Sequence, residues 1–290
     1  MHPAPSIIAF TTFSGLGFGL LFWLGLGQPS VTGTTAFAFF TLAYLMAVGG
    51  LLASTLHLGN PARAWRAFSQ WKTSWLSREG CAAVATLLVM ALYGAGLVFW
   101  DMRIVWLGYL GAALSLGTVF ATAMIYAQLK TVPRWNTALT PAHFLAYALA
   151  GGALLSSKLM IAGALLIIAA ALQIAVWIRG DRAFAASGST TATATGLKGQ
   201  AIRSFERPHT GSNYLLREMV YVVGRKHVRV LRVIALGLGT ALPALILLAL
   251  PVGHLLAPVA LLLHIIGVLA ARWLFFAQAR HVVAIYYGEG

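Results

Sequence analysis

Charged residues are scarce in this sequence. Asp, Glu, Lys and Arg together make up 9% of its 290 residues, whereas 60% are hydrophobic. Soluble domains average roughly 25% charged residues, so the composition excludes an ordinary soluble protein. Only six residues are acidic against 20 basic ones, which gives a formal net charge of +14. Carboxylates that can exchange protons are therefore few enough to be considered one by one.

Cysteine is almost absent as well. The single cysteine, Cys81, excludes an internal disulfide, a cysteine-ligated iron–sulfur cluster and a covalently attached c-type haem. The first residues, "MHPAPSIIAF", carry no basic segment of the kind that opens a signal peptide. We therefore expect the first apolar run to be a helix that the protein retains.

Long apolar runs fill most of the chain. Each has about 20 residues, the length that a helix needs to cross a hydrocarbon core of roughly 30 Å. Lipid cannot satisfy exposed backbone groups, so each crossing must be a complete helix. The sequence predicts an all-α, polytopic integral membrane protein with one membrane domain over 1–290. Its eight transmembrane helices are expected at 5–27, 34–57, 80–100, 104–129, 141–157, 159–178, 231–252 and 255–276.

Basic residues fall almost entirely on one side of this eight-helix arrangement. Arg103 and Lys158 lie in short loops on one side, and every other Lys and Arg lies in or next to the loops of the opposite side. The positive-inside rule then predicts cytoplasmic N- and C-termini and cytoplasmic long loops. It also explains the net charge without a nucleic-acid partner. We expect a multi-pass protein of the bacterial cytoplasmic (inner) membrane.

The longest loop, 179–230, is predicted to have two parts. Residues 185–200 are rich in small residues and are typical of a flexible linker. Residues 213–230 are basic and amphipathic. Such a segment lies on anionic lipid as an interfacial helix or forms a docking surface for a cytoplasmic partner, and the two roles are compatible.

Glu79 is the carboxylate that the prediction sets at the membrane rim. Asp101 sits in a short external turn beside Arg103, where a solvated local pair is expected, and the other four acidic residues lie in the long loop or the tail. An ionisable group at membrane depth is a candidate for function. Glu79 either complements the positive end of the helix dipole or exchanges protons with a ligand.

His57 closes the second predicted helix at the same rim, in "LHLGNPARAW" at 56–65. His57 and Glu79 therefore bracket one loop. An imidazole both donates and accepts hydrogen bonds, and a neighbouring carboxylate can pass protons to water. This pair suits a ligand that takes up or releases protons at the bilayer edge, as a quinone does. A cap of the helix end is the alternative role for His57.

Three further kinds of residue are candidates. Tyr126, at the end of the fourth predicted helix, can donate to a ligand, although tyrosine is ordinary at an interface. Arg272, about a turn inside the last helix, pairs with Glu79 or a ligand carbonyl, or extends its charge to the interface. The sequence allows a haem bound by two of the histidines His57, His143 and His264. No helix carries the two histidines that ligation of two stacked haems requires. No metal site is predicted.

The block "STLHLGNPARAWRAFSQWKTSWLSREG" at 54–80 resembles the signature of the membrane anchor subunits of dimethyl-sulfoxide-reductase-type complexes. "YAQLKTVPRWNTALTP" at 126–141 and "ARWLFF" at 271–276 resemble later blocks of the same family. The likeness extends over nearly the whole chain. It implies a site for ubiquinone or menaquinone, with His57 and Glu79 in quinol binding and proton handling. Arg63 and Arg272 match motif positions with less defined roles, and the resemblance disfavours haem on this chain.

The same resemblance implies partners. In that family an iron–sulfur subunit connects the anchor to a molybdopterin catalytic subunit. Two further segments, "RPHTGSNYLLREM" and "MHPAPSIIAFTT", resemble the anchors of cytoplasmic, membrane-bound sulfite dehydrogenases. This resemblance implies that electrons from sulfite pass to a quinone here. It also implies that both partner subunits lie on the cytoplasmic side. A quinol-oxidising anchor of a sulfoxide or related reductase is the alternative. A secondary transporter is disfavoured, because the sequence has neither an evident inverted repeat nor mid-membrane carboxylates.

Overall fold

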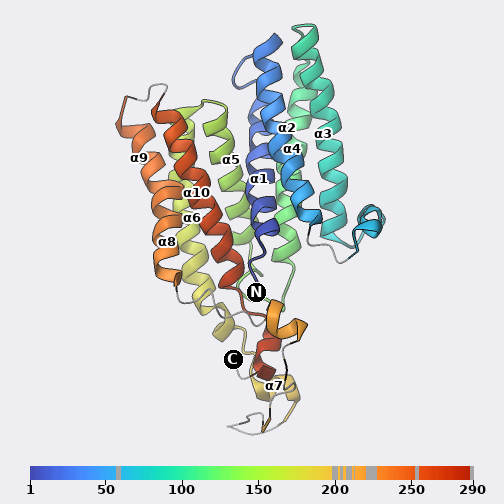
Figure 1. Ribbon diagram of the computed structural model, residues 1–290, viewed down its shortest axis with the longest axis vertical. Coiled ribbons are helices and arrows are strands. Elements are labelled where there is room, and N and C mark those ends of the chain that lie inside the picture. The colour runs from blue at the N-terminus through green and yellow to red at the C-terminus, as the bar shows by residue number, and fades with distance from the viewer. Residues whose placement is uncertain are drawn as a thin grey trace.

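The computed structural model is a bundle of helices that run roughly along one long axis (Figure 1). It describes residues 1–56, 60–197, 202, 205–206, 211, 213–219, 227–251 and 255–287, without the side chain of Pro61. His57 and residues 220–226 of the amphipathic stretch therefore lie outside the described residues.

Helices account for all the regular structure of the described residues, which confirms the all-α prediction. The long ones are α1 (Pro5–Gly25), α2 (Gly33–Thr55), α3 (Trp75–Phe99), α4 (Val105–Ala127), α5 (Leu139–Leu155), α6 (Leu159–Ala186) and α10 (Leu256–Ala277). A further rod joins α8 (Val228–Leu236), the π-helical turn η4 (Gly237–Ala241) and α9 (Leu242–Ala249). The short elements are η1 (Pro61–Phe68), α7 (Thr191–Thr195), η2 (Leu215–Met219) and η5 (Val282–Tyr287).

Seven of these helical stretches are long and apolar enough to cross a membrane, the rod α8–η4–α9 among them. The helix α5 is apolar but shorter, with 17 residues. A membrane protein with many apolar helices is thus confirmed, whereas the count of eight crossings stays a prediction.

Two helix ends differ from their predicted positions in ways that matter for the polar residues. The helix α3 begins at Trp75 rather than at 80, so Glu79 lies inside its second turn. The helix α6 continues to Ala186 instead of ending at 178. Its polar end stays helical because Asp181 forms ion pairs with Arg134 and Arg232 of neighbouring segments.

The expected pair of Asp101 with Arg103 is wrong. Asp101 adopts the left-handed backbone region at φ 51°, in the turn between α3 and α4. Arg103 instead reaches back to the C-terminal end of α1, where its Nη2 donates to the Leu26 carbonyl at 2.8 Å. A carbonyl of a helix end lacks an intrahelical partner, so this contact satisfies a group that would otherwise be unpaired.

The bundle has two halves that meet along α1. One half contains α1 to α4, and the other contains α5, α6, α10 and the rod α8–η4–α9 (Figure 1). The helix α1 packs against α2 and α4 in its own half and against α5 and α10 in the other. The N-terminus and η5 lie at the same end of the bundle (Figure 1), and the Met1 amino group donates to the Ala279 carbonyl there at 2.7 Å.

Small residues allow α1 and α5 to meet backbone to backbone. A Cβ atom added to Gly19 would collide with the backbone of Ala148, and one added to Gly152 would collide with the backbone of Gly19. Lipid offers no hydrophobic driving force between helices, so close packing of small residues is a main source of helix association.

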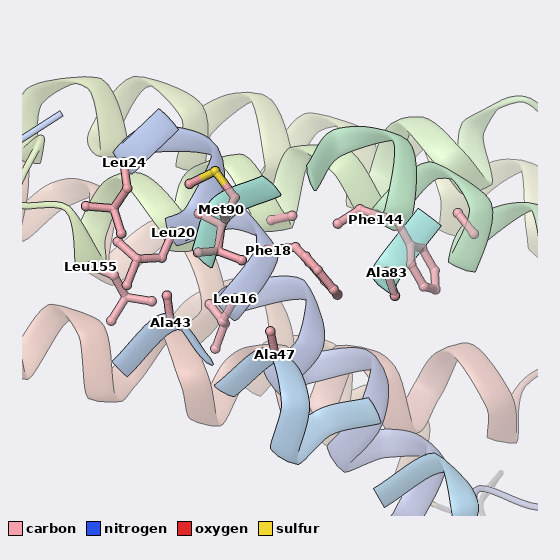
Figure 2. Close-up of a cluster of buried hydrophobic side chains, with 14 of the residues drawn as sticks. Leu16, Phe18, Leu20, Leu24, Ala43, Ala47, Ala83, Met90, Phe144 and Leu155 are labelled. Carbon is pink, nitrogen blue, oxygen red and sulfur yellow. The ribbon is translucent and has the colours of Figure 1, made fainter. Parts of the chain in front are cut away.

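Large apolar side chains fill the space on either side of this contact. Figure 2 shows Leu16, Phe18, Leu20 and Leu24 of α1 in one buried cluster with side chains from α2, α3 and α5. Because α1 contributes buried side chains on all its faces, it is the central helix of the bundle.

Replacement of Gly19 by alanine tests the α1–α5 contact. The added methyl meets backbone atoms, which cannot move aside as a flexible side chain can. We expect Gly19→Ala to lower the free energy of unfolding by about 1–3 kcal/mol, as overpacked cores do. Thermal unfolding of the purified chain in detergent measures it. Gly15→Ala in the same helix is the control, because its Cβ meets nothing within 4 Å; equal loss in both variants would contradict the role of this contact.

Candidate functional site

Buried polar side chains gather at the end of the bundle where α3 begins and where α4 and α10 end. Glu79 of α3 is 4% exposed and Arg272 of α10 is 2% exposed. Thr122 and Tyr126 lie one turn apart on α4; Thr122 contacts Glu79, and Tyr126 lies within electrostatic reach of Glu79 and Arg272. We call Glu79, Thr122, Tyr126 and Arg272 the rim cluster.

Glu79 contacts the rim cluster through Thr122. The Thr122 hydroxyl lies 2.5 Å from Glu79 Oε1 and 3.0 Å from the carbonyl of Thr118. A hydroxyl carries one proton, so an ionised Glu79 competes with that carbonyl for it, whereas a protonated Glu79 donates and satisfies both bonds. No Lys or Arg of the described chain lies within ion-pair distance of Glu79. These contacts thus favour the protonated carboxyl group.

Tyr126 lies within electrostatic reach of both Glu79 and Arg272. Its partly buried phenol contacts four aromatic side chains, with distances of 5.3–6.0 Å between ring centroids: Trp135, Phe144, Phe275 and Phe276. These rings come from α5, from the end of α10 and from the segment before α5. Aromatic packing from the other half of the bundle and from the segment before α5 therefore fixes the position of the phenol on α4.

Arg272 has no carboxylate partner among the described residues. Its guanidinium carbon lies 3.6 Å from the centroid of the Phe144 ring and 5.8 Å from that of Tyr147. Its Nε and Nη1 are buried without a hydrogen-bond partner. Arg272 neither pairs with Glu79 nor extends to the interface, although the sequence allows both. Unpaired donors in an apolar interior are costly, which makes this guanidinium a candidate for a ligand oxygen.

A second set of buried polar residues lies next to Arg272 and includes Tyr147, which the guanidinium faces. The sequence did not predict that these residues lie together. His143 Nε2 is 2.8 Å from Gln173 Oε1, and the Tyr147 hydroxyl donates to the same oxygen at 3.2 Å. The ring nitrogen Nδ1 of His264 lies 2.6 Å from the carbonyl of Gly239, in the π-helical turn η4. The spacing of His143 and Tyr147, one helical turn apart, is the signal that was available.

The sequence also predicts His57 and Arg63 as site residues. His57 lies outside the described residues. Arg63 is exposed on η1, the short helix between α2 and α3. This helix packs against α3 near the rim cluster, with Phe68 next to Gly80. Glu79, Tyr126 and Arg272 thus lie at the same end of the bundle and Arg63 lies on the surface, whereas their roles stay predictions.

An apolar groove of about 590 Å³ runs between α2 and α3. Phe37, Phe40 and Leu52 line it from α2, and Ala91 and Val98 from α3. On α2 the groove extends to Leu52, in the last turn before Thr55 ends the helix. On α3, however, the lining runs from Ala91 to Phe99, in the C-terminal half of that helix, so this part of the groove lies at the end of the bundle opposite to Glu79.

Comparison with known proteins adds four findings. The family model described as "DMSO reductase anchor subunit (DmsC)" matches residues 4–288. A sulfite dehydrogenase subunit of Allochromatium vinosum is 32% identical, with 99% of both proteins covered. Two anaerobic dimethyl sulfoxide reductase proteins of Escherichia coli, one of them named YnfH, are each 32% identical over 42% of this sequence and 43% of their own. No solved structure matches significantly.

The family model and the sulfite dehydrogenase relative both extend over nearly the whole chain, and the rim cluster lies within the matched residues. The chain belongs to the DMSO reductase anchor subunit family.

Proposed function

We propose that this chain is the quinone-reactive membrane anchor of a molybdopterin and iron–sulfur oxidoreductase that passes electrons from sulfite to quinone. Family membership supports the coarser statement that the chain is an anchor subunit of a molybdoenzyme complex. The observation that carries the quinone role is the rim cluster, because a buried carboxyl group and a guanidinium with unpaired donors both lie within electrostatic reach of one tyrosine.

Reduction of a quinone to a quinol takes two electrons and two protons. In our proposal Glu79 gives the two protons one after the other to the quinone oxygens and is reprotonated from cytoplasmic water after each transfer, with Thr122 orienting the carboxyl group. Arg272 donates from Nε and Nη1 to a ligand oxygen and stabilises the negative charge that electrons bring to it. Tyr126 donates its hydroxyl proton in a hydrogen bond to the same headgroup. His57 completes the headgroup site from the end of α2.

The apolar groove between α2 and α3 is proposed to hold the hydrophobic tail of the quinone. Its lining residues are nearly all apolar, and the hydroxyl of Tyr44 there is occupied, because it donates to the Leu87 carbonyl. On α2 the groove extends to Leu52, near the end of the helix, and the proposed tail would run from there along α2 with the headgroup towards Glu79. Ubiquinone and menaquinone both fit this description.

The direction from sulfite to quinone is supported by the relative that the chain matches over 99% of both lengths, which is named for sulfite dehydrogenase. Sulfite would be oxidised on a separate molybdopterin subunit, and an iron–sulfur subunit would carry the electrons to this chain. Both partners are proposed to lie on the cytoplasmic side, next to the exposed residues Arg63 and Arg66 of η1. The Escherichia coli relatives support the alternative of a quinol-oxidising reductase anchor.

We further propose eight crossings in the bacterial cytoplasmic membrane, with both termini in the cytoplasm. The helix α5 counts as the eighth crossing because it is apolar and packs between α1 and α6 within the same layer. The excess of basic residues at the end of the bundle that holds the N-terminus and η5 supports the orientation.

Glu79→Gln tests the proton role in membranes that contain the whole complex. We expect sulfite-dependent quinone reduction to fall about 100-fold, because the amide cannot exchange the proton. Electron transfer from sulfite to a water-soluble acceptor such as ferricyanide should persist, since it does not need the anchor site. Asp101→Asn is the matched control: it makes the same chemical change on an exposed carboxylate, and asparagine tolerates the left-handed backbone there. A normal rate in Glu79→Gln would contradict the proposal.

A reporter fused after Gly290 tests the orientation. We expect a reporter that needs the cytoplasm to be active and one that needs the periplasm to be inactive. A second fusion after Lys158, in the short loop before α6, should give the opposite pattern. Periplasmic activity of the C-terminal fusion would contradict the cytoplasmic sulfite assignment and would favour a reductase anchor with an exported catalytic subunit.

A further inference from the structure

Arginine side chains surround a second cavity, of about 930 Å³, at the end of the bundle where α6 ends and α8 begins. Arg134, Arg229, Arg232 and Arg280 line it, and Asp181 is the carboxylate in the lining. None of these residues belongs to the rim cluster. The cavity is therefore a feature that the proposed quinone chemistry does not use.

The helix arrangement creates this space. At the end of the bundle away from the cavity, α6 packs closely against α9, and Gly163 of α6 lies against Leu248. Towards the cavity, α8 packs against α10 instead, so α6 and α8 diverge. Arg134 lies across α6 at Gly180, where an added Cβ would come within 2.6 Å of its Nη1. The missing side chain at Gly180 thus lets a guanidinium form part of the cavity wall.

Positive charge exceeds negative charge in the lining. Asp181 Oδ1 accepts from Arg134 Nη2 at 2.6 Å and from Arg232 Nη2 at 2.6 Å, and its Oδ2 accepts from Arg232 Nη1 at 2.9 Å. Burial lowers the pKa of Arg134 below its ordinary value, the Asp181 contacts oppose this, and the like charges of Arg232 and Arg280 add to it. Arg229 has no ion pair among the described residues and is exposed at the cavity. An anion bound here would relieve the repulsion.

We propose that this cavity binds the phosphate headgroup of an anionic phospholipid. Arginine forks match phosphate oxygens in two-point hydrogen bonds. Basic cavities between helices at a membrane surface recognise anionic headgroups. The surroundings suit an amphiphile rather than a free anion, because Val230 and Val233, 60% and 72% exposed, continue along α8 from the cavity into the apolar span. Acyl chains would lie along this face.

The bound headgroup would have a structural consequence. It would bridge the diverging ends of α6 and α8. On one side it would contact Arg134, which lies against Gly180 of α6, and on the other side Arg229 and Arg232 of α8. These ends lack the close backbone packing seen between α6 and α9 and are joined by side chains, the ion pair of Arg232 with Asp181 and the contact of Arg232 with the Trp177 ring. The lipid would thereby complete the packing of the second half of the bundle.

Native mass spectrometry of the purified full chain tests this proposal. Phosphatidylglycerol and phosphatidylcholine with identical acyl chains are titrated separately, and bound lipid is counted. We expect phosphatidylglycerol to bind more tightly. Arg229→Gln should weaken its binding about fivefold and Arg229→Glu about 25-fold, from the roughly 1 kcal/mol that each basic residue contributes near an anionic lipid. Phosphatidylcholine binding should not change.

Arg66→Gln is the matched control, since Arg66 is an exposed arginine on η1, away from the cavity. Equal binding of the two lipids, or equal weakening by Arg66→Gln and Arg229→Gln, would overturn the proposal. Displacement of phosphatidylglycerol by inorganic phosphate at the same concentration would assign the cavity to a free anion and overturn the lipid assignment. Loss of a partner subunit from the Arg229→Gln complex, without a change in lipid binding, would make the cavity a protein interface and would likewise overturn it.

Discussion

The backbone contact of α1 with α5 at Gly19 and Gly152 joins the two halves of the bundle, and the candidate site depends on that joint. Glu79 and Tyr126 come from α3 and α4 of one half, whereas Arg272 comes from α10 of the other. Phe144 of α5 supports Arg272 and also contacts Tyr126. A small shift between the halves would move Arg272 and Phe144 relative to Tyr126, so small residues in the middle of α1 affect the polar groups at its end.

The two arginine environments of this chain show what the membrane imposes. At the cavity between α6 and α8, guanidinium groups share the carboxylate of Asp181. Arg272, inside the span, has aromatic faces around it and two buried N–H groups without partners. Cation–π contact compensates part of the lost hydration but leaves these donors unused. A buried cation with free donors, within electrostatic reach of the same tyrosine as a buried carboxyl group, fits the proposed quinone headgroup, which offers acceptor oxygens and needs protons.

Sequence reasoning predicted the all-α class and the residues that form most of the rim cluster. The length of the apolar runs indicates the helices. Because charged residues are scarce, each ionisable residue near a helix end is easily recognised as a candidate. Thr122 and Phe144 could not be predicted as partners of Glu79 and Arg272. The helix α1 and its neighbours are apolar on all faces, so no amphipathic pattern indicates how each helix is rotated.

Helix ends and turns could not be predicted from the sequence either. The ion pairs of Asp181 depend on Arg134 and Arg232, which are distant in the chain, and these pairs accompany the extension of α6 to Ala186. The Arg103 contact with Leu26 joins two turns in the same way. Both contacts belong to tertiary structure, and local propensity does not contain them.

Photoaffinity labelling of the whole complex with an azido-quinone, followed by mass spectrometry of this chain, tests the quinone proposal most directly. We expect labelled peptides from the start of α3, the end of α4 or the end of α10, with labelling suppressed by unmodified quinone. Labelling confined to the opposite end of the bundle, around Val105 and Leu159, would contradict the proposal.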